Sequence, residues 1–294
     1  MAHRFHIVDV FAESLYAGNT LAVVRDAGDL DTQTMQAIAR EFGFSETTFL
    51  VSDPRDALGA GVRVRIFTPT FELPFAGHPT LGTAWVLREH LLSGRPAAVT
   101  LALGVGPVPV AFEPAEGGEL AFLTAPPVTL GARVPGEKVA RVLGLSPSDL
   151  DPALPVQRAK AGPGFAIVPL LRREALARVR FDVGAYLELA KEDASTGIYA
   201  FAREAEHPTN HIRARMFFES AGPREDPATG SATACFGAYL LEHRVYGDAL
   251  RLRIEQGVEM GRPSLLHVEA SRASGAPRIR VGGRTLESAR GELL

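Results

Sequence analysis

Two stretches of this sequence share one design: a turn that contains glycine, proline and polar residues leads directly into an apolar helix. The first spans residues 72–90 and reads ELPFAGHPTLGTAWVLREH; the second spans residues 224–243 and reads REDPATGSATACFGAYLLEH. In the second, apolar residues fill both the helical period and the positions between, so the helix has almost no polar face. A helix that is apolar all round is buried, and these runs are too short to cross a bilayer. We therefore predict that each helix lies inside a protein core.

The two stretches are in register along the chain. Three pairs of residues at matching points are all 150 positions apart: Phe67 and Phe217 at strand ends, Ala76 and Asp226 in the turns, and Ser45 and Ser195 upstream. An ungapped match at one offset indicates two copies of one unit. A chain of 294 residues suits two domains, each long enough to bury a core.

Short segments that alternate between apolar and polar residues surround both helices, and we interpret them as strands. Many short strands and one buried helix in each half predict an α+β fold with two pseudo-symmetric domains, each a β-barrel wrapped around its central helix. We expect the first domain to span residues 1–118, completed by C-terminal strands in residues 275–294. The second is expected to span residues 119–274.

Local signals predict three further features. Asp31 can cap a helix that ends at Gly43. The composition of residues 114–119 makes them the best candidate for the linker between domains. Residues 278–281 and 284–286 flank two glycines and are predicted to form a hairpin.

The composition excludes several classes of protein. The net charge is −3 and arginine is well mixed with glutamate, so we predict neither a nucleic-acid nor a membrane partner. The sequence begins with a strand pattern rather than a signal peptide, which makes the cytoplasm the default location. A single cysteine, Cys235, excludes an internal disulfide and a thiolate metal site. No residue set has metal-ligand spacing and no Gly-x-Gly-x-x-Gly follows a strand, so neither metal nor cofactor is expected.

The start of each apolar helix is a candidate anion site. The first N–H groups of a helix have no acceptor within it and are positively polarised, which suits a carboxylate or phosphate. Gly77 and Gly230 would allow close approach of the backbone, and the repeat could direct both helices at one cleft between the halves. In the alternative interpretation these glycines only make tight turns.

Three polar residues stand at these turns: His78, Asp226 and Ser231. Together they suggest a Ser-His-Asp hydrolase, but Ser231 lies in Ala-Thr-Gly-Ser-Ala rather than in a Gly-x-Ser-x-Gly elbow. Structural roles are also possible. Ser231 can cap a helix, His78 before Pro79 fits an N-cap, and Asp226 fits an Asx turn.

Glu46 is the candidate acid or base. It follows Ser45 at the start of an apolar strand, and its counterpart in the repeat is Thr196. One carboxylate on one side of a duplicated site breaks the symmetry, as a single general acid/base would. The alternative is an exposed glutamate at a strand edge.

At this point the sequence resembles the phenazine-biosynthesis PhzF-like family, nearly from end to end. The segments that carry the resemblance are AGNTLAVV (17–24), FSETTFL (44–50), RIFTPTFELPFAGHPTLGTA (65–84), EDPATGSA (225–232) and EQGVEMGRPS (255–264). The resemblance implies a diaminopimelate-epimerase-like fold and a homodimer. It also implies that Glu46 transfers the proton, and that a small carboxylic acid is bound by Asn19, Ser45, Gly77, His78, Asp226, Gly230 and Ser231.

One departure bears on mechanism. The related epimerases and racemases use two opposed cysteines, whereas the matching turns here contain Ala76 and Asp226, and Cys235 is expected in the core. We therefore expect a cofactor-independent isomerase that shifts a proton within a small unsaturated amino or hydroxy acid. A non-catalytic acid-binding protein and, less strongly, a serine hydrolase are the alternatives. Neither the substrate nor a role in phenazine synthesis follows from the motifs.

Overall fold

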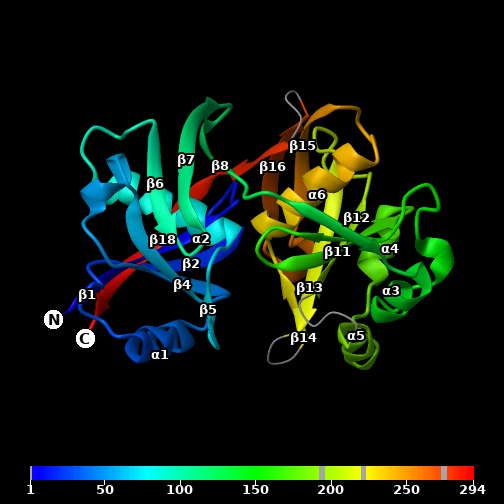
Figure 1. The fold of residues 1–294 in the computed structure, drawn as a ribbon, viewed down its shortest axis with the longest axis horizontal. Helices are drawn as coiled ribbons and strands as arrows, with labels where there is room; N and C mark the ends of the chain where they lie inside the picture. Colours follow the sequence, from blue (N-terminus) through cyan, green and yellow to red (C-terminus); the bar gives the residue numbers. More distant parts are fainter. Residues whose placement is uncertain (1, 192–195, 220–222, 273–276) are drawn as a thin grey trace. The chain divides into compact units, whose positions relative to one another are not determined.

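The structure is a computed structural model that describes residues 2–191, 196–219, 223–272 and 277–294. The chain divides into two compact units, residues 1–124 with 282–294 (unit 1) and residues 125–281 (unit 2). Each unit mixes strands with a few helices (Figure 1), so the α+β class is confirmed. No helix among the described residues is long and apolar enough to cross a membrane.

Unit 1 is built mainly from antiparallel strand pairs. Its strands are β1 (His3–Val10), β2 (Asn19–Val24), β3 (Glu46–Leu50), β4 (Val62–Phe67), β5 (Glu72–Leu73), β6 (Ala98–Leu103), β7 (Gly106–Ala115), β8 (Gly118–Thr124) and β18 (Thr285–Leu293). Strand β1 pairs with β2 and β18, while β3–β4, β4–β5, β6–β7 and β7–β8 are antiparallel neighbours. Two parallel pairings, β2–β3 and β4–β6, connect these groups.

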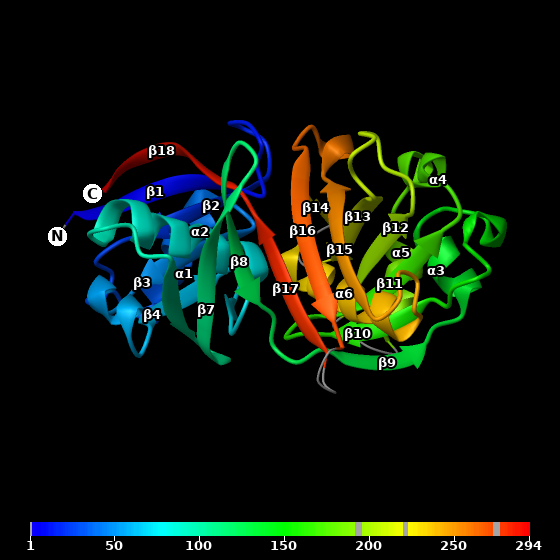
Figure 2. The same cartoon turned by 90° about the horizontal axis from the view of Figure 1, so that it is seen from above.

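Helix α2 (Gly77–Val86) lies among the strands of unit 1 and continues into a π-helical turn, η2 (Leu87–Leu91) (Figures 1 and 2). It contacts β1, β2, β3, β6, β7, β8 and β18. Every residue of α2 except Trp85 is buried, as its apolar sequence predicts. A Cβ at Gly82 would lie 2.7 Å from Leu21 Cδ2 and 2.8 Å from Val10 Cγ2, so glycine permits this close packing.

The outer helix of unit 1, α1 (Thr32–Phe42), follows the predicted cap signals. The Asp31 carboxylate accepts a hydrogen bond from the backbone N–H of Thr34 at 2.7 Å. Gly43 ends the helix in the left-handed conformation at φ 65°. A short 3-10 helix, η1 (Pro54–Leu58), follows β3.

Unit 2 has a similar content of strands and more helices. The strands are β9 (Thr129–Arg133), β10 (Gln157–Lys160), β11 (Gly164–Leu170), β12 (Thr196–Ala202), β13 (Ile212–Glu219), β14 (Pro223–Asp226), β15 (Ala249–Gln256), β16 (Ser264–Ser271) and β17 (Arg278–Gly283), whose last two residues belong to unit 1. The helices are α3 (Gly136–Val142), α4 (Arg173–Arg178), α5 (Val183–Ala190) and α6 (Gly230–Glu242), with short 3-10 turns η3 (Pro147–Asp149) and η4 (Val258–Met260). Helix α6 is buried over Gly230–Leu241 and contacts β9, β10, β11 and β16.

The strand orders of the two units correspond. In unit 1, β2 and β3 are parallel, β3–β4–β5 antiparallel, and β4 parallel to β6. In unit 2, β11 and β12 are parallel, β12–β13–β14 antiparallel, and β13 parallel to β15. Equivalent strands therefore run before and after the turns that lead into α2 and α6.

A side-chain cluster is repeated on these strands. Arg65 donates two hydrogen bonds to Glu72, at 2.7 and 2.6 Å, and its guanidinium lies 5.0 Å from the Phe67 ring centroid. In unit 2 the same cluster is formed by Arg215, Phe217 and Glu225, with hydrogen bonds of 2.7 and 2.7 Å and a ring distance of 4.9 Å. The arginines and the phenylalanines are each 150 positions apart, at the offset found in the sequence.

The structure differs from the sequence prediction in two connections. Residues 114–119 do not link domains: they form the turn of the β7–β8 hairpin, where Ala115 pairs with Gly118, and β8 stays in unit 1. The predicted hairpin in the tail is also wrong, because β18 pairs with β1 from His3 opposite Leu293 to Val10 opposite Thr285. Residue 275, where the C-terminal strands were predicted to rejoin the first domain, lies outside the described residues. So does Ser195, one of the positions matched in the repeat.

Candidate active site

Glu46 is the first residue of β3 and lies beside Leu21 in the parallel β2–β3 pairing. One of its carboxylate oxygens, Oε2, is 3.4 Å from Nε2 of His78, the second residue of α2. The Glu46 side chain is 16% exposed and that of His78 5% exposed. The fold thus brings together an acid and an imidazole that are separated by more than thirty residues, in a place largely shielded from water.

The buried position of the His78 imidazole favours its neutral form. Burial lowers its pKa from the ordinary 6.5 to about 3, and a hydrogen bond with the backbone of Thr20 is a smaller effect in the opposite direction. Its other ring nitrogen, Nδ1, lies 3.3 Å from the Asn19 side-chain amide. Asn19 is the first residue of β2 and is buried, so it helps to fix the ring that faces Glu46.

The start of α2 differs from the sequence prediction. His78 is not the N-cap: Ala76 has that role, and no side chain caps the helix. Gly77 and His78 are the first two helical residues, while Pro79 has no N–H and the Thr80 N–H bonds to the carbonyl of Ala76 at 3.3 Å. The helix therefore has two backbone N–H groups without an acceptor in the helix, both on buried residues, and one of these residues, His78, approaches Glu46.

In unit 2, α6 begins at Gly230 and its N-cap is Thr229, again without a side-chain cap. Ser231 is the second residue of the helix, so the predicted capping role of its hydroxyl is wrong. The Thr233 N–H returns to the carbonyl of Thr229 at 2.9 Å. The N–H groups of Gly230, Ser231 and Ala232 thus precede the first helical hydrogen bond.

Asp226, the last residue of β14, is held by residues that the sequence prediction overlooked. Its carboxylate accepts a hydrogen bond from the Thr229 hydroxyl at 2.5 Å, and its backbone carbonyl accepts one from Gln256 Nε2 at 2.8 Å. Gln256 is fully buried and also bonds to the N–H of Thr229 at 3.3 Å and to its hydroxyl at 3.1 Å. No local signal in the sequence identifies this role, because Asp226 and Thr229 are about thirty positions away from Gln256.

Within their own units, the contacts of Asp226 and His78 differ from those of a Ser-His-Asp triad. In such a triad the aspartate accepts a hydrogen bond from the second nitrogen of the histidine. Here Asp226 accepts one from Thr229, and the second nitrogen of His78 faces Asn19. Ser45, the remaining candidate, is half-buried immediately before β3.

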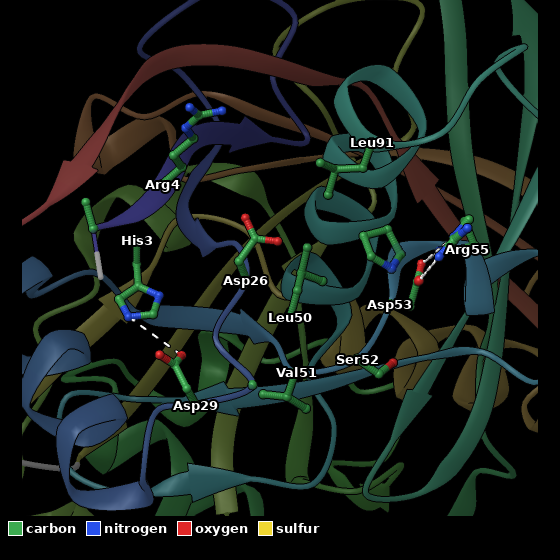
Figure 3. Close-up of a pocket in the computed structure, with 13 residues that line it drawn as sticks. His3, Arg4, Asp26, Asp29, Leu50, Val51, Ser52, Asp53, Arg55 and Leu91 are labelled. Atoms are coloured by element: carbon green, nitrogen blue, oxygen red, sulfur yellow. Dashed lines mark hydrogen bonds and ion pairs between the residues drawn. The ribbon is translucent and has the colours of Figure 1, made fainter.

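A cavity of about 810 Å³ in unit 1 contains none of the predicted site residues (Figure 3). Its wall includes Asp26, Asp29 and Asp53, all exposed. Figure 3 shows His3 facing Asp29, 3.8 Å away, and Asp53 paired with Arg55. Hydrogen bonds from Arg55 lower the pKa of the Asp53 carboxyl to about 2. Exposed, solvated acids of this kind make a poor general base, in contrast to Glu46.

The structure also shows a potential metal-binding cluster. His6, His90 and Glu287 of unit 1 bring ligand atoms within 4.8 Å of one another, although no such set was expected from sequence spacing. Spacing along the chain could not predict it, because the three residues belong to β1, η2 and β18.

Comparison with known proteins agrees with the fold and with these motifs. A family model described as phenazine biosynthesis-like protein matches residues 8–291. An uncharacterized isomerase of Mesorhizobium japonicum is 38% identical, with 99% of this chain and 98% of that protein covered. The trans-2,3-dihydro-3-hydroxyanthranilate isomerase of Pseudomonas aeruginosa is 36% identical, with 92% of this chain and 91% of that protein covered.

A solved structure gives the same result. The phenazine biosynthesis protein of the PhzF family from Bacillus anthracis superposes with a TM-score of 0.90 at 27% identity, and covers 100% of this chain and 99% of that one. The match extends through both units and includes the segments around Glu46, His78 and Asp226. The chain belongs to the phenazine biosynthesis-like family of PhzF proteins.

Proposed function

We propose that this isomerase moves a proton from one carbon to another within a small unsaturated amino or hydroxy carboxylic acid, with Glu46 as general acid/base and without a cofactor. The observation that carries the proposal is the 3.4 Å approach of the Glu46 carboxylate to the buried His78 imidazole. Isomerase is part of the name of relatives that match the chain over nearly its whole length.

A neutral imidazole suits a carboxylate that must change protonation state. A histidine cation would hold Glu46 ionised, whereas a neutral ring can donate to the carboxylate in one tautomer or accept from the carboxylic acid in the other. The lowered pKa of His78 supports the neutral form throughout the physiological range. Glu46 could then remove a proton and return it, as the reaction requires.

The proposed step balances within one molecule. The Glu46 carboxylate takes a proton from an activated carbon, and the electron pair of the broken C–H bond delocalises over the conjugated system. The resulting carboxylic acid then protonates a different carbon. Glu46 ends as it began, and the substrate changes only in the position of one hydrogen and of its double bonds.

The substrate carboxylate is assigned to the helix starts. The N–H groups of Gly77 and His78 in unit 1, and of Gly230 and Ser231 in unit 2, are donors at positively polarised helix ends. They would bind the anion and stabilise the negative charge that develops as the proton leaves. Following the family pattern, Asp226 and Ser231 are proposed to contact polar groups of a substrate, and Asn19 and Ser45 are proposed to support Glu46.

We also propose that the units are copies of one ancestral unit, each a β-barrel around its helix, with unit 1 formed by the N-terminal residues and the C-terminal strand. The repeated cluster of Arg65, Phe67 and Glu72 supports this, as does the matching strand order. A homodimer is proposed on the basis of the family, and sedimentation equilibrium would test it.

One relative indicates the substrate class. The relative in Pseudomonas aeruginosa is named for an unsaturated, hydroxylated amino acid. We propose an acid with the same elements, namely a carboxylate, a nearby amino or hydroxyl group, and conjugated double bonds. The proposal does not include a role in phenazine synthesis.

Proton exchange in heavy water tests the proposed function. A panel of small unsaturated amino and hydroxy acids is incubated with wild type, Glu46→Gln and the control Glu72→Gln, which removes an acid on exposed β5. Mass spectrometry then measures carbon-bound deuterium. We expect uptake with wild type and the control, and none with Glu46→Gln. If some acids bind in a thermal-shift assay but none exchanges, the result would favour the alternative of a non-catalytic acid-binding protein.

A further inference from the structure

Three side chains of unit 1 that the proposed reaction does not use converge at one point. His6 of β1 and His90 of η2 approach the two oxygens of the Glu287 carboxylate in β18. His6 Nδ1 is 2.7 Å from Oε1, and His90 Nε2 is 3.3 Å from Oε2. The His6 side chain is 5% exposed and the other two are 22% exposed. The cluster is therefore largely sheltered from solvent.

The spacing of these atoms matches the first shell of a metal ion. Zinc binds imidazole nitrogen and carboxylate oxygen at roughly 2.0–2.2 Å, so two ligand atoms in a tetrahedral shell lie about 3.3 Å apart. The observed 2.7 and 3.3 Å come close to this value without a metal. One ligand atom from each of the three residues lies within 4.8 Å of the others, so a metal ion could contact all three after local adjustment of the side chains.

Two observations indicate that the cluster is more than an internal hydrogen-bond group. His90 Nε2 is buried, yet it has no hydrogen-bond partner among the described residues, because its geometry toward Glu287 is unsuitable. The rings are also held in place: His6 stacks on His90 with centroids 4.4 Å apart, and Trp85 packs edge-on against His90 at 5.7 Å. Preset ligands of this kind lower the cost of ordering a site.

The open side of the cluster is a cavity of about 310 Å³. His6 and His90 line it together with Arg4, Arg25 and Arg290, and the Nε–H of Arg25 is buried without a hydrogen-bond partner among the described residues. Arg4 is paired at 3.2 Å with Glu292, which also lines the cavity. The guanidinium groups of Arg25 and Arg290 still favour a negatively charged occupant. A metal ion with three protein ligands has a fourth position for such a group or for water.

We propose that His6, His90 and Glu287 bind a divalent transition-metal ion of the zinc type, with the fourth position open to a small anion in the arginine-lined cavity. The metal would join the first strand, the last strand and the turn that continues α2, which are distant in sequence. Because such a link restricts long loops of the unfolded chain, the metal should stabilise unit 1. The proposal is independent of the reaction assigned to Glu46.

The test uses the full chain after treatment with a chelator. Zn²⁺ binding is followed by titration calorimetry, and Co²⁺ is used as a visible-absorption probe of a tetrahedral site. The variants are Glu287→Gln and His90→Gln, which change half-buried ligands, and the control is His207→Gln, which removes an exposed histidine of unit 2. Circular dichroism verifies that each is folded; if one ligand variant is unfolded, the other decides.

We expect wild type and His207→Gln to bind one equivalent of Zn²⁺ and to gain several degrees in Tm. Both ligand variants should bind at least about 100-fold more weakly, since even the loss of an outer-shell partner costs 10–100-fold. Equal affinity in all four proteins would mean adventitious binding and would overturn the proposal. So would stabilisation by phosphate alone, without any effect of the metal, which would identify an anion pocket.

Discussion

The starts of α2 and α6 use the same backbone arrangement for different chemistry. Each buried helix begins with a glycine, has no side-chain cap and follows an antiparallel strand pair. At α2 an acid, Glu46, faces the neutral ring of His78 at 3.4 Å. At α6 the acid, Asp226, accepts a 2.5 Å hydrogen bond from the Thr229 hydroxyl, and Gln256 holds its backbone.

This difference separates proton transfer from substrate binding. A carboxylate beside a neutral imidazole can exist in both protonation states, as a general acid/base must. A carboxylate that accepts a hydrogen bond from a neighbouring hydroxyl is held in one orientation and is suited to orient a ligand. We infer that duplication supplied two similar anion sites and that only unit 1 acquired an acid/base.

The largest effect is expected from exchanging the two acids for their amides. Glu46→Gln should lower kcat by about 10²–10⁴-fold with little change in KM, because general acid/base groups contribute by this amount. Asp226→Asn should mainly raise KM. Steady-state kinetics on an acid identified by the exchange panel distinguishes the two. Equal losses of kcat in both variants would contradict the assignment of proton transfer to Glu46 and of substrate binding to Asp226.

The repeated arginine cluster sharpens the comparison through stability. In unit 2 the side chains of Arg215 and Glu225 are 9% and 14% exposed, whereas those of Arg65 and Glu72 are 28% and 40% exposed. Glu225→Gln should therefore lower the free energy of unfolding by about 2–4 kcal/mol, and Glu72→Gln by less than about 1 kcal/mol. Urea denaturation measures both. Similar losses of unfolding free energy in the two variants would show that the greater burial of the cluster in unit 2 does not make it more important for stability.

The pH dependence of stability distinguishes His78 from Ser231, the residue at the same point of α6. Because burial lowers the pKa of folded His78 from 6.5 to about 3, the unfolded chain binds the proton first as the pH falls. The contribution of His78 to stability is complete above about pH 7 and is lost progressively toward pH 3.

Between pH 7 and pH 5 this histidine alone should reduce the free energy of unfolding by about 2 kcal/mol. Between pH 7 and pH 5, His78→Gln should therefore lose about 2 kcal/mol less stability than wild type. Ser231→Ala should lose as much stability as wild type. Parallel denaturation curves at the two pH values measure the difference. An unchanged pH dependence in His78→Gln would contradict a neutral, buried ring.

The smallest effect compares packing around the two helices. A Cβ at Gly82 would meet Leu21 at 2.7 Å, and one at Gly237 would meet Val268 at 3.0 Å. Alanine gains about 1 kcal/mol in helix propensity, which crowding of 1–3 kcal/mol offsets. We expect Gly82→Ala to be destabilising by about 1 kcal/mol and Gly237→Ala to be near neutral in thermal denaturation.

Local signals in the sequence predicted the local features of the fold. Asp31 and Gly43 mark the ends of α1 because capping depends on residues close in sequence. The apolar runs predicted that α2 and α6 are buried, because no face of either helix is polar.

Features that depend on contacts between residues far apart in the chain could not be predicted from the sequence. Residues 278–286 have the pattern of a hairpin, but β18 pairs with β1 at the other end of the chain. Gln256 carries no signal of its role, since its partners at Asp226 and Thr229 are about thirty positions away. The cluster of His6, His90 and Glu287 could not be predicted for the same reason, because its residues lie in β1, η2 and β18.

The central claim is that one carboxylate removes the proton and returns it to the same molecule. The most direct measurement is a single-turnover reaction in ordinary water with an acid deuterated at the carbon that loses its hydrogen. We predict that a measurable fraction of the deuterium appears at the other carbon of the product with wild type, and that Glu46→Gln gives no product. Product formed by wild type without any transferred deuterium, or turnover by Glu46→Gln, would contradict the account.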